Sequence, residues 1–77
     1  MEIKLFGIAK DIVGKKVLKL DHSPANVELL KKYLIDEYPE FSNLNSLAIA
    51  VNHYYAEEEK TLSKYDEIAV IPPVSGG

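Results

Sequence analysis

The sequence predicts an α+β fold in which one main helix packs on one face of a mixed sheet of four to five strands. Several short segments alternate apolar and polar residues, as half-buried strands do, and one longer segment repeats apolar residues at helical spacing. The 77 residues, of which 47% are hydrophobic, suffice for one core and leave no room for a second domain. We therefore expect residues 1–71 to form the domain and residues 72–77 to form an extended C-terminal tail.

Two strands and a short helical connection are expected at the N-terminus. Residues 2–6 alternate strictly, which makes them a half-buried strand and points the Phe6 side chain outward. Residues 7–14 begin and end with glycine and space their apolar residues as a helix does, so a helical turn is expected within a hairpin connection. Residues 16–20 then form a second strand, which is expected to pair antiparallel with the first.

The main helix is predicted to run to about Tyr38, because Pro39 cannot continue it. Its start has two candidates. Ser23 can cap the helix with Pro24 at the first helical position, and Asn26 is the competing cap one turn later. The helix carries one apolar stripe that we expect to pack on the core, formed by Val27, Leu30, Leu34 and Tyr38.

The second half of the chain predicts three further strands, at residues 46–52, 54–56 and 67–71. Phe41 lies in the loop that follows the helix and is expected to fold back onto the core. Asn52 and His53 are expected to form a tight turn. The three glutamates at 57–59 read as a solvated loop face, and Leu62 as a residue of the core.

This order of elements allows the last strand to pair parallel beside the first through a right-handed crossover. The resulting topology is the β-grasp, or ubiquitin-like, roll, whose helix covers one face of the sheet and leaves the other face open. Alternation places Phe6 and Ile71 on the open face, and we expect Tyr55 to join them. These three side chains are predicted to form a small apolar patch on which a partner docks.

The last strand leads directly into a short tail. Pro72 and Pro73 end the strand, because proline lacks the N–H that a partner strand needs. The six tail residues reach roughly 20 Å at about 3.1–3.4 Å per residue. Gly76 and Gly77 have no side chains, so they fit a passage too narrow for other residues. Once activated as an acyl-adenylate, the α-carboxylate of Gly77 can accept an amine, a thiol or a sulfide.

The sequence Pro72-Pro73-Val74-Ser75-Gly76-Gly77 resembles the terminal signature of the molybdopterin synthase small subunit, the MoaD-type ubiquitin-like sulfur carrier. The resemblance covers essentially the whole chain. It includes the opening at residues 5–14, the helix with its Tyr-Pro stop, the Ala-Val-Asn at 50–52 and the Asp-Glu-Ile at 66–68. The chain differs from the family pattern at Lys10-Asp11, Tyr65 and Val70-Ile71, where arginine–glutamate, glycine and two aromatic residues are usual.

The resemblance implies a non-catalytic, sulfur-donating subunit of an enzyme complex in molybdenum cofactor biosynthesis. A ubiquitin-activating-type enzyme would adenylate the Gly77 carboxylate with ATP, and a sulfur donor protein would supply the sulfur of a thiocarboxylate. The tail would then enter the large synthase subunit, in an assembly expected to be a heterotetramer, and pass its sulfur to a precursor pterin. The residues that would thread into the partner are Pro72, Pro73, Val74, Ser75 and Gly76. No cofactor is expected on the isolated chain, since the activating partner uses the ATP.

Two alternatives remain open at this point. The first is a sulfur carrier for thiamine synthesis or tRNA thiolation, because such carriers share the roll and the Gly-Gly ending. The second belongs to another class, a ubiquitin-like interaction module or one that is conjugated to protein lysines.

Composition argues against several other functions. The net charge of −3 disfavours nucleic acid and anionic membranes as partners and favours a basic protein surface. The chain has no cysteine, and its glutamate run lacks metal-loop spacing, so no metal site is expected. The two histidines, His22 and His53, and the hydroxyls of Ser23 and Ser75 match no nucleophile motif, so we expect no catalysis by this chain alone. Neither a signal peptide nor a long apolar run is visible, which favours a cytoplasmic protein.

Overall fold

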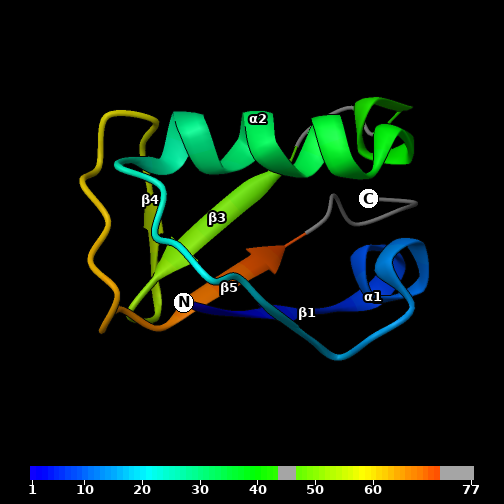
Figure 1. The fold of residues 1–77 in the computed structure, drawn as a ribbon, viewed down its shortest axis with the longest axis horizontal. Coiled ribbons are helices and arrows are strands. Elements are labelled where there is room, and N and C mark those ends of the chain that lie inside the picture. The colour runs from blue at the N-terminus through cyan, green and yellow to red at the C-terminus, as the bar shows by residue number, and fades with distance from the viewer. Residues whose placement is uncertain (44–46, 72–77) are drawn as a thin grey trace.

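The computed structural model describes residues 1–43 and 47–71 and shows a five-stranded mixed sheet with one helix across a single face (Figure 1). The strand order is β2-β1-β5-β3-β4, with β1 and β5 parallel and all other neighbours antiparallel. The elements are β1 (Glu2–Leu5), α1 (Gly7–Val13), β2 (Val17–Lys19), α2 (Val27–Glu37), the 3-10 helix η1 (Pro39–Asn43), β3 (Ala48–Val51), β4 (Tyr54–Ala56) and β5 (Ile68–Ile71). The predicted β-grasp roll is confirmed, although β1, β2, β3 and β5 are shorter than their sequence patterns indicated.

The core lies between α2 and the sheet face that it covers. Alternation along the strands sends every second side chain toward the helix, and the pairing register brings these side chains together. Ile3 pairs with Ile68 in the parallel ladder, and Ile49 pairs with Val70 in the antiparallel one. All four of these residues are completely buried. Cross-strand apolar pairs of this kind are what hold the central strands together.

Helix α2 begins at its second candidate cap. The side chain of Asn26 accepts a hydrogen bond of 2.9 Å from the backbone N–H of Leu29, and the backbone of Asn26 is extended, as an N-cap requires. Of the two candidates, Asn26 is therefore the cap and Ser23 is not. Ala25 and Val27 are held by backbone bonds to Leu62 and Lys60, so the chain before Asn26 runs beside another segment and is not helical.

The apolar stripe of α2 packs as predicted. Its first three members, Val27, Leu30 and Leu34, are completely buried, and Tyr38 at the end of the helix is half-buried. The Tyr38 ring meets the ring of Phe41 edge to face, with 6.2 Å between centroids. Phe41 thus returns to the core from η1 and is only 2% exposed, which confirms its predicted burial.

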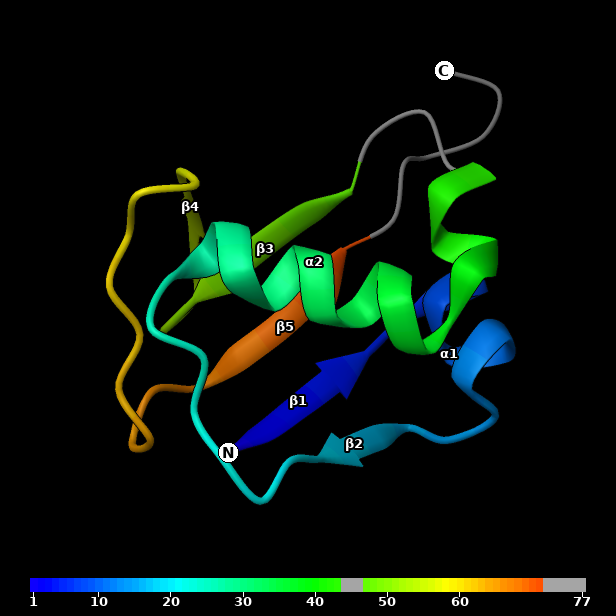
Figure 2. The ribbon, with the colours of Figure 1, turned by 45° about the horizontal axis from the view of Figure 1, so that its top comes forward.

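Helix α1 closes the end of the sheet at which β1 ends, and η1 lies beside it (Figure 2). Gly14 terminates the helix in the left-handed conformation, with φ at 83°, and its N–H donates to the Lys10 carbonyl at 2.7 Å. This is the usual role of a glycine that follows a helix. The chain then continues into β2. The predicted helical turn within the hairpin connection is therefore confirmed, and it is the helix α1.

Candidate functional site

The sheet face that α2 leaves open carries small and apolar side chains in its middle. Across this face, Lys4 lies opposite Ala69, Ala69 opposite Ala50, and Ala50 opposite Tyr55. Ile71 lies opposite Ala48 in the next row. Because alanine covers little of the sheet, the larger side chains around it stand above a hollow.

That hollow is a shallow depression of about 430 Å³. Its lining contains all three residues predicted to form a docking patch, Phe6, Tyr55 and Ile71. Phe6 is 50% exposed and Tyr55 is 75% exposed, whereas Ile71 is half-buried. The structure therefore brings the three side chains to one concave surface, which leaves large apolar groups in water in the isolated chain.

The depression also has a charged rim that the sequence analysis did not include. Glu67 Oε2 lies 3.3 Å from Lys4 Nζ and 3.5 Å from His53 Nε2, and all three residues line the hollow. Lys4 and Glu67 could have been found from sequence, since they share the alternation phase of Phe6 and Ile71. His53 could not, because its position depends on the turn between β3 and β4.

The β3–β4 turn is fixed by the Asn52 side chain. Asn52 and His53 both have positive φ, at 53° and 76°, which confirms the predicted tight turn. The Asn52 amide donates to Asp66 Oδ1 at 3.0 Å, and its oxygen accepts from the Glu67 N–H at 2.9 Å. Asp66 Oδ2 also accepts from the Ser63 N–H at 2.8 Å. The hydrogen bonds from Ser63 and Asn52 hold the pKa of the Asp66 carboxyl below its usual value, and the bond from Ser63 has the larger effect.

A second, larger hollow of about 570 Å³ lies along the outer edge of β4. Tyr55 lines it too, but its other lining residues run from Val51 to Lys60 and include Glu57 and Glu59. It contains neither Phe6 nor Ile71. The open-face depression is therefore the candidate site.

The second histidine lies elsewhere. The His22 ring bonds to Asp21 at 3.1 Å and meets the Tyr33 ring edge to face at 5.4 Å. The hydrogen bond from His22 lowers the pKa of the exposed Asp21 carboxyl, and burial raises the pKa of the Tyr33 hydroxyl. His22 and His53 do not come together with any hydroxyl that the sequence analysis considered, within the residues that the structure describes.

The described residues offer neither a metal-binding cluster nor a membrane-spanning helix. Over residues 1–43 and 47–71, no group of three or more histidine, cysteine, aspartate or glutamate side chains is arranged to hold a metal ion. None of the helices that the structure describes combines the length and the apolar character needed to cross a bilayer.

The predicted tail residues lie outside the part of the chain that the structure describes. They are Pro72, Pro73, Val74, Ser75, Gly76 and Gly77, and their roles stay predictions, as does the boundary of the tail. What the structure does show is where the tail is attached. Ile71, the last residue of β5, lines the open-face depression, so the chain enters the tail from the candidate site itself.

A helix grasped by a mixed sheet, with parallel first and last strands and an apolar open face, defines the class of small ubiquitin-like β-grasp proteins. Within that class, residues 3–77 match the ThiS family. The chain belongs to this family. The match extends to residue 77 and so includes the whole segment from Pro72 to Gly77, whose sequence resembles the terminal signature of MoaD-type sulfur carriers.

Known proteins of similar sequence and structure agree with this assignment. A molybdopterin synthase sulfur carrier subunit from Dictyostelium discoideum is 35% identical over 82 residues, covering 99% of this chain and 94% of that protein. Small archaeal modifier protein 1 from Methanosarcina acetivorans has a TM-score of 0.79 at 26% identity, over 99% of this chain and 94% of that one. One chain of the complex of subunits 1 and 2 of the molybdopterin-converting factor from Helicobacter pylori has a TM-score of 0.62 at 26% identity, covering 99% of this chain and 96% of that one. The inferred resemblance is confirmed, and by family the chain is a sulfur carrier of the MoaD/ThiS type.

Proposed function

We propose that this chain is the sulfur-carrying small subunit of a molybdopterin synthase and that the Gly77 carboxylate is the carrier group. The observation that supports this most is the family match, which continues to residue 77 and so takes in the whole tail. The name and full-length coverage of the Dictyostelium relative favour the pterin pathway within the family. The proposed product of the pathway is the pterin dithiolene of the molybdenum cofactor.

The proposed chemistry changes one atom of the tail. A Gly77 carboxylate oxygen attacks the α-phosphorus of ATP on an activating enzyme, pyrophosphate leaves, and an acyl-adenylate forms. Hydrosulfide, the form in which the donor protein would deliver the sulfur, then attacks the acyl carbon, AMP leaves with the bonding electron pair, and the S–H proton is lost to solvent. The product is a thiocarboxylate at Gly77, in which sulfur replaces one oxygen. The large synthase subunit would supply the side chains that transfer this sulfur to the precursor pterin.

The open face has a clear part in this proposal. A tail of six residues can deliver its end into a partner only if the folded domain is held nearby and in one orientation. Phe6 and Tyr55 line the same depression as Ile71, the last residue of β5 before the tail, so docking there would fix the root of the tail. Pro72 and Pro73 would restrict the conformations that the tail must give up on binding.

The proposed partners follow from these steps. They are an ATP-using enzyme of the ubiquitin-activating type, a sulfur donor protein and a large synthase subunit, the last in a heterotetramer. The Helicobacter pylori complex of subunits 1 and 2 of the molybdopterin-converting factor supports an assembly of two kinds of chain. The proposal places this chemistry in the cytoplasm and requires no cofactor on the isolated chain.

The test is the intact mass of the chain after incubation with its activating enzyme, ATP and a sulfide source. The expected result is a gain equal to the exchange of one oxygen for one sulfur, localised to Gly77 and absent without ATP. A chain that lacks Gly77 is the matched control and should gain nothing. An unchanged mass for the full-length chain, under conditions in which the activating enzyme is competent, would overturn the proposal.

A second candidate function is conjugation to other proteins, since a protein named as a small modifier has the same fold at a TM-score of 0.79. Its acyl-adenylate would accept a lysine amine in place of sulfide. Immunoblots of cell extract against this chain distinguish the two. Heavier covalent adducts that vanish when Gly77 is deleted would support conjugation, whereas a single band of the free chain would support a dedicated sulfur carrier.

A further inference from the structure

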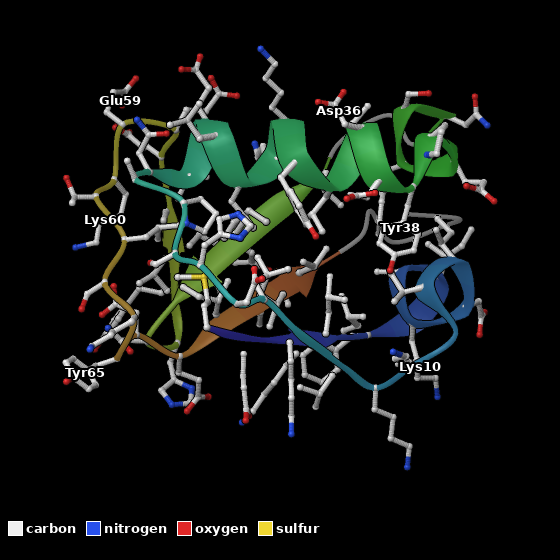
Figure 3. The ribbon with its side chains drawn as sticks, viewed as in Figure 1. Lys10, Asp36, Tyr38, Glu59, Lys60 and Tyr65 are labelled. Carbon is white, nitrogen blue, oxygen red and sulfur yellow. The ribbon has the colours of Figure 1, made fainter. Side chains whose placement is uncertain are left out.

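The charge of this protein is divided unequally between two parts of the chain. Residues 1–19 contain five lysines and two carboxylates, for a charge of +3, although the whole chain is at −3. The remaining residues contain four lysines and ten carboxylates, for a charge of −6. In Figure 3, Lys10 lies at the α1 end of the molecule and Glu59 lies in the loop at the opposite end.

The positive part gathers around one of the docking residues. A depression of about 320 Å³ is lined by Phe6, by its neighbours in β1, α1 and β2, and by the three lysines Lys4, Lys10 and Lys16. The backbone fixes this arrangement, because Leu5 N–H donates to the Lys16 carbonyl at 2.9 Å and Lys10 N–H to the Phe6 carbonyl at 3.4 Å. We name Lys4, Lys10 and Lys16 the lysine corner.

The lysine corner continues directly into the open-face depression. Phe6 and Lys4 line both hollows, so the two form one surface with Phe6 at its middle. Lys4 is paired with Glu67. Lys10 and Lys16, by contrast, are exposed and have no carboxylate within ion-pair distance in the part of the chain that the structure describes.

We propose that the lysine corner is a docking surface for an acidic patch on the protein that receives the tail, most directly the large synthase subunit. This inference rests on the proposed function and adds the charge of the partner to it. The net charge of −3 favoured a basic partner surface, but the lysines beside Phe6 are positive and therefore favour an acidic one. A partner that covers Phe6 must also meet Lys10 and Lys16, and carboxylates there would avoid the cost of burying unpaired cations.

A protein partner fits the distribution better than nucleic acid does. A polyanion longer than the lysine corner would extend over the rest of the chain, whose charge is −6. A folded partner can place a few carboxylates locally and meet the apolar depression with another part of its surface. The main effect expected of such complementary charges is faster and better oriented association.

The test compares two charge-reversal variants of equal net charge. Lys10→Glu/Lys16→Glu changes the lysine corner, and Lys32→Glu/Lys64→Glu changes exposed lysines on α2 and in the loop before β5. Association with the purified large subunit is followed by stopped-flow fluorescence at low and at physiological ionic strength. We expect the corner variant to associate about tenfold more slowly at low ionic strength and the control variant to change less than about threefold. The deficit should shrink as salt screens the charges.

Three other outcomes would overturn the inference. Equal slowing by both variants would mean that only net charge matters, and no slowing by either would mean that the corner is not in the interface. Binding of tRNA to the wild type that the corner variant loses would assign the corner to nucleic acid. Circular dichroism of each variant confirms folding. The wild-type mass gain at Gly77 is measured in parallel, so that failure of the carrier chemistry is separate from failure of the lysine corner.

Discussion

Asn52 shows how one side chain positions part of the candidate site. Its amide group joins the β3–β4 turn to the segment before β5 through Asp66 and the Glu67 N–H. The same turn places His53 on the rim of the depression, where it approaches Glu67. Positive φ at both turn residues costs free energy, and these hydrogen bonds offset that cost.

The Asp66 carboxylate should make the stability of this region depend on pH. Its folded pKa lies below the ordinary value of 3.8, so its contribution is complete above that value and is lost as pH falls through the folded pKa. We expect Asp66→Ala to lower the free energy of unfolding at neutral pH and the gap from wild type to narrow in acid. Urea unfolding across the acid range measures this, with neutral Asp66→Asn as the matched variant. A gap that stays constant from about pH 7 to about pH 2 would contradict the assignment.

The start of α2 gives a second prediction at single-residue scale. Asn26→Ala removes the acceptor for the Leu29 N–H and should cost about 1 kcal/mol in the free energy of unfolding. Ser23→Ala, at the other candidate cap, should change the free energy of unfolding by less than about 0.5 kcal/mol, because Ser23 is exposed. Chemical denaturation of both variants decides the point, and equal losses would show that Asn26 is not the sole cap.

At the scale of elements, the pairing of β1 with β5 determines where the candidate site forms. The parallel register puts Leu5 opposite Val70 in the core. The residues that follow these two, Phe6 just after β1 and Ile71 at the end of β5, therefore lie side by side on the open face. Chain segments 65 residues apart thus build one surface at the root of the tail. Alanines in the centre of the face keep that surface concave.

This arrangement predicts that Phe6 matters for binding and little for folding. Phe6→Ala should weaken binding to the large synthase subunit about tenfold or more, because exposed aromatic residues at the centre of an interface often dominate its affinity. Its unfolding midpoint should stay near that of wild type, since half of the side chain is already exposed. Leu29→Ala, which truncates a residue 45% exposed on α2, is the control and should not affect binding. Isothermal titration calorimetry measures both, and similar affinities for the two variants would argue against the docking face.

At the scale of the whole molecule, stability depends on one small core. A domain of this size is stabilised by about 0.05–0.15 kcal/mol per residue. Fourteen buried apolar residues make up the core in the described part of the chain, and α2, η1 and the covered face of the sheet all contribute to it. A single large cavity should therefore cost a substantial share of the total.

Phe41 is the residue on which this expectation can be tested. It is the largest of the fully buried side chains and joins η1 to Tyr38 at the end of α2. Phe41→Ala should lower the free energy of unfolding by about 3–5 kcal/mol and leave the protein close to unfolded. Phe41→Leu should cost less, at about 1–2 kcal/mol, because more of the volume is kept. Thermal and urea unfolding measure both, and a loss below about 1 kcal/mol for the alanine variant would place Phe41 outside the core.

Sequence alone determined the elements, the roll and the fact that Phe6, Tyr55 and Ile71, the predicted docking residues, share the open face. Alternation and helical spacing record which side of each segment is buried, and that information is local to each segment. The same information did not determine where the strands and the main helix begin and end. Alternation continues beyond the last ladder hydrogen bond, so the strands were predicted too long. The two candidate caps of the main helix, three residues apart, are distinguished only by a tertiary contact, the hydrogen bond from the Leu62 N–H to the Ala25 carbonyl.

Tertiary structure decided what depends on contacts between distant segments. The ion pairs of Glu67 with Lys4 and His53, and the gathering of Lys4, Lys10 and Lys16 around Phe6, join residues from different elements. Net charge is a sum over the chain and does not say where on the surface the charges lie, so it predicted a basic partner for the whole molecule. Folding separates the charges in space, and the side that surrounds Phe6 is positive.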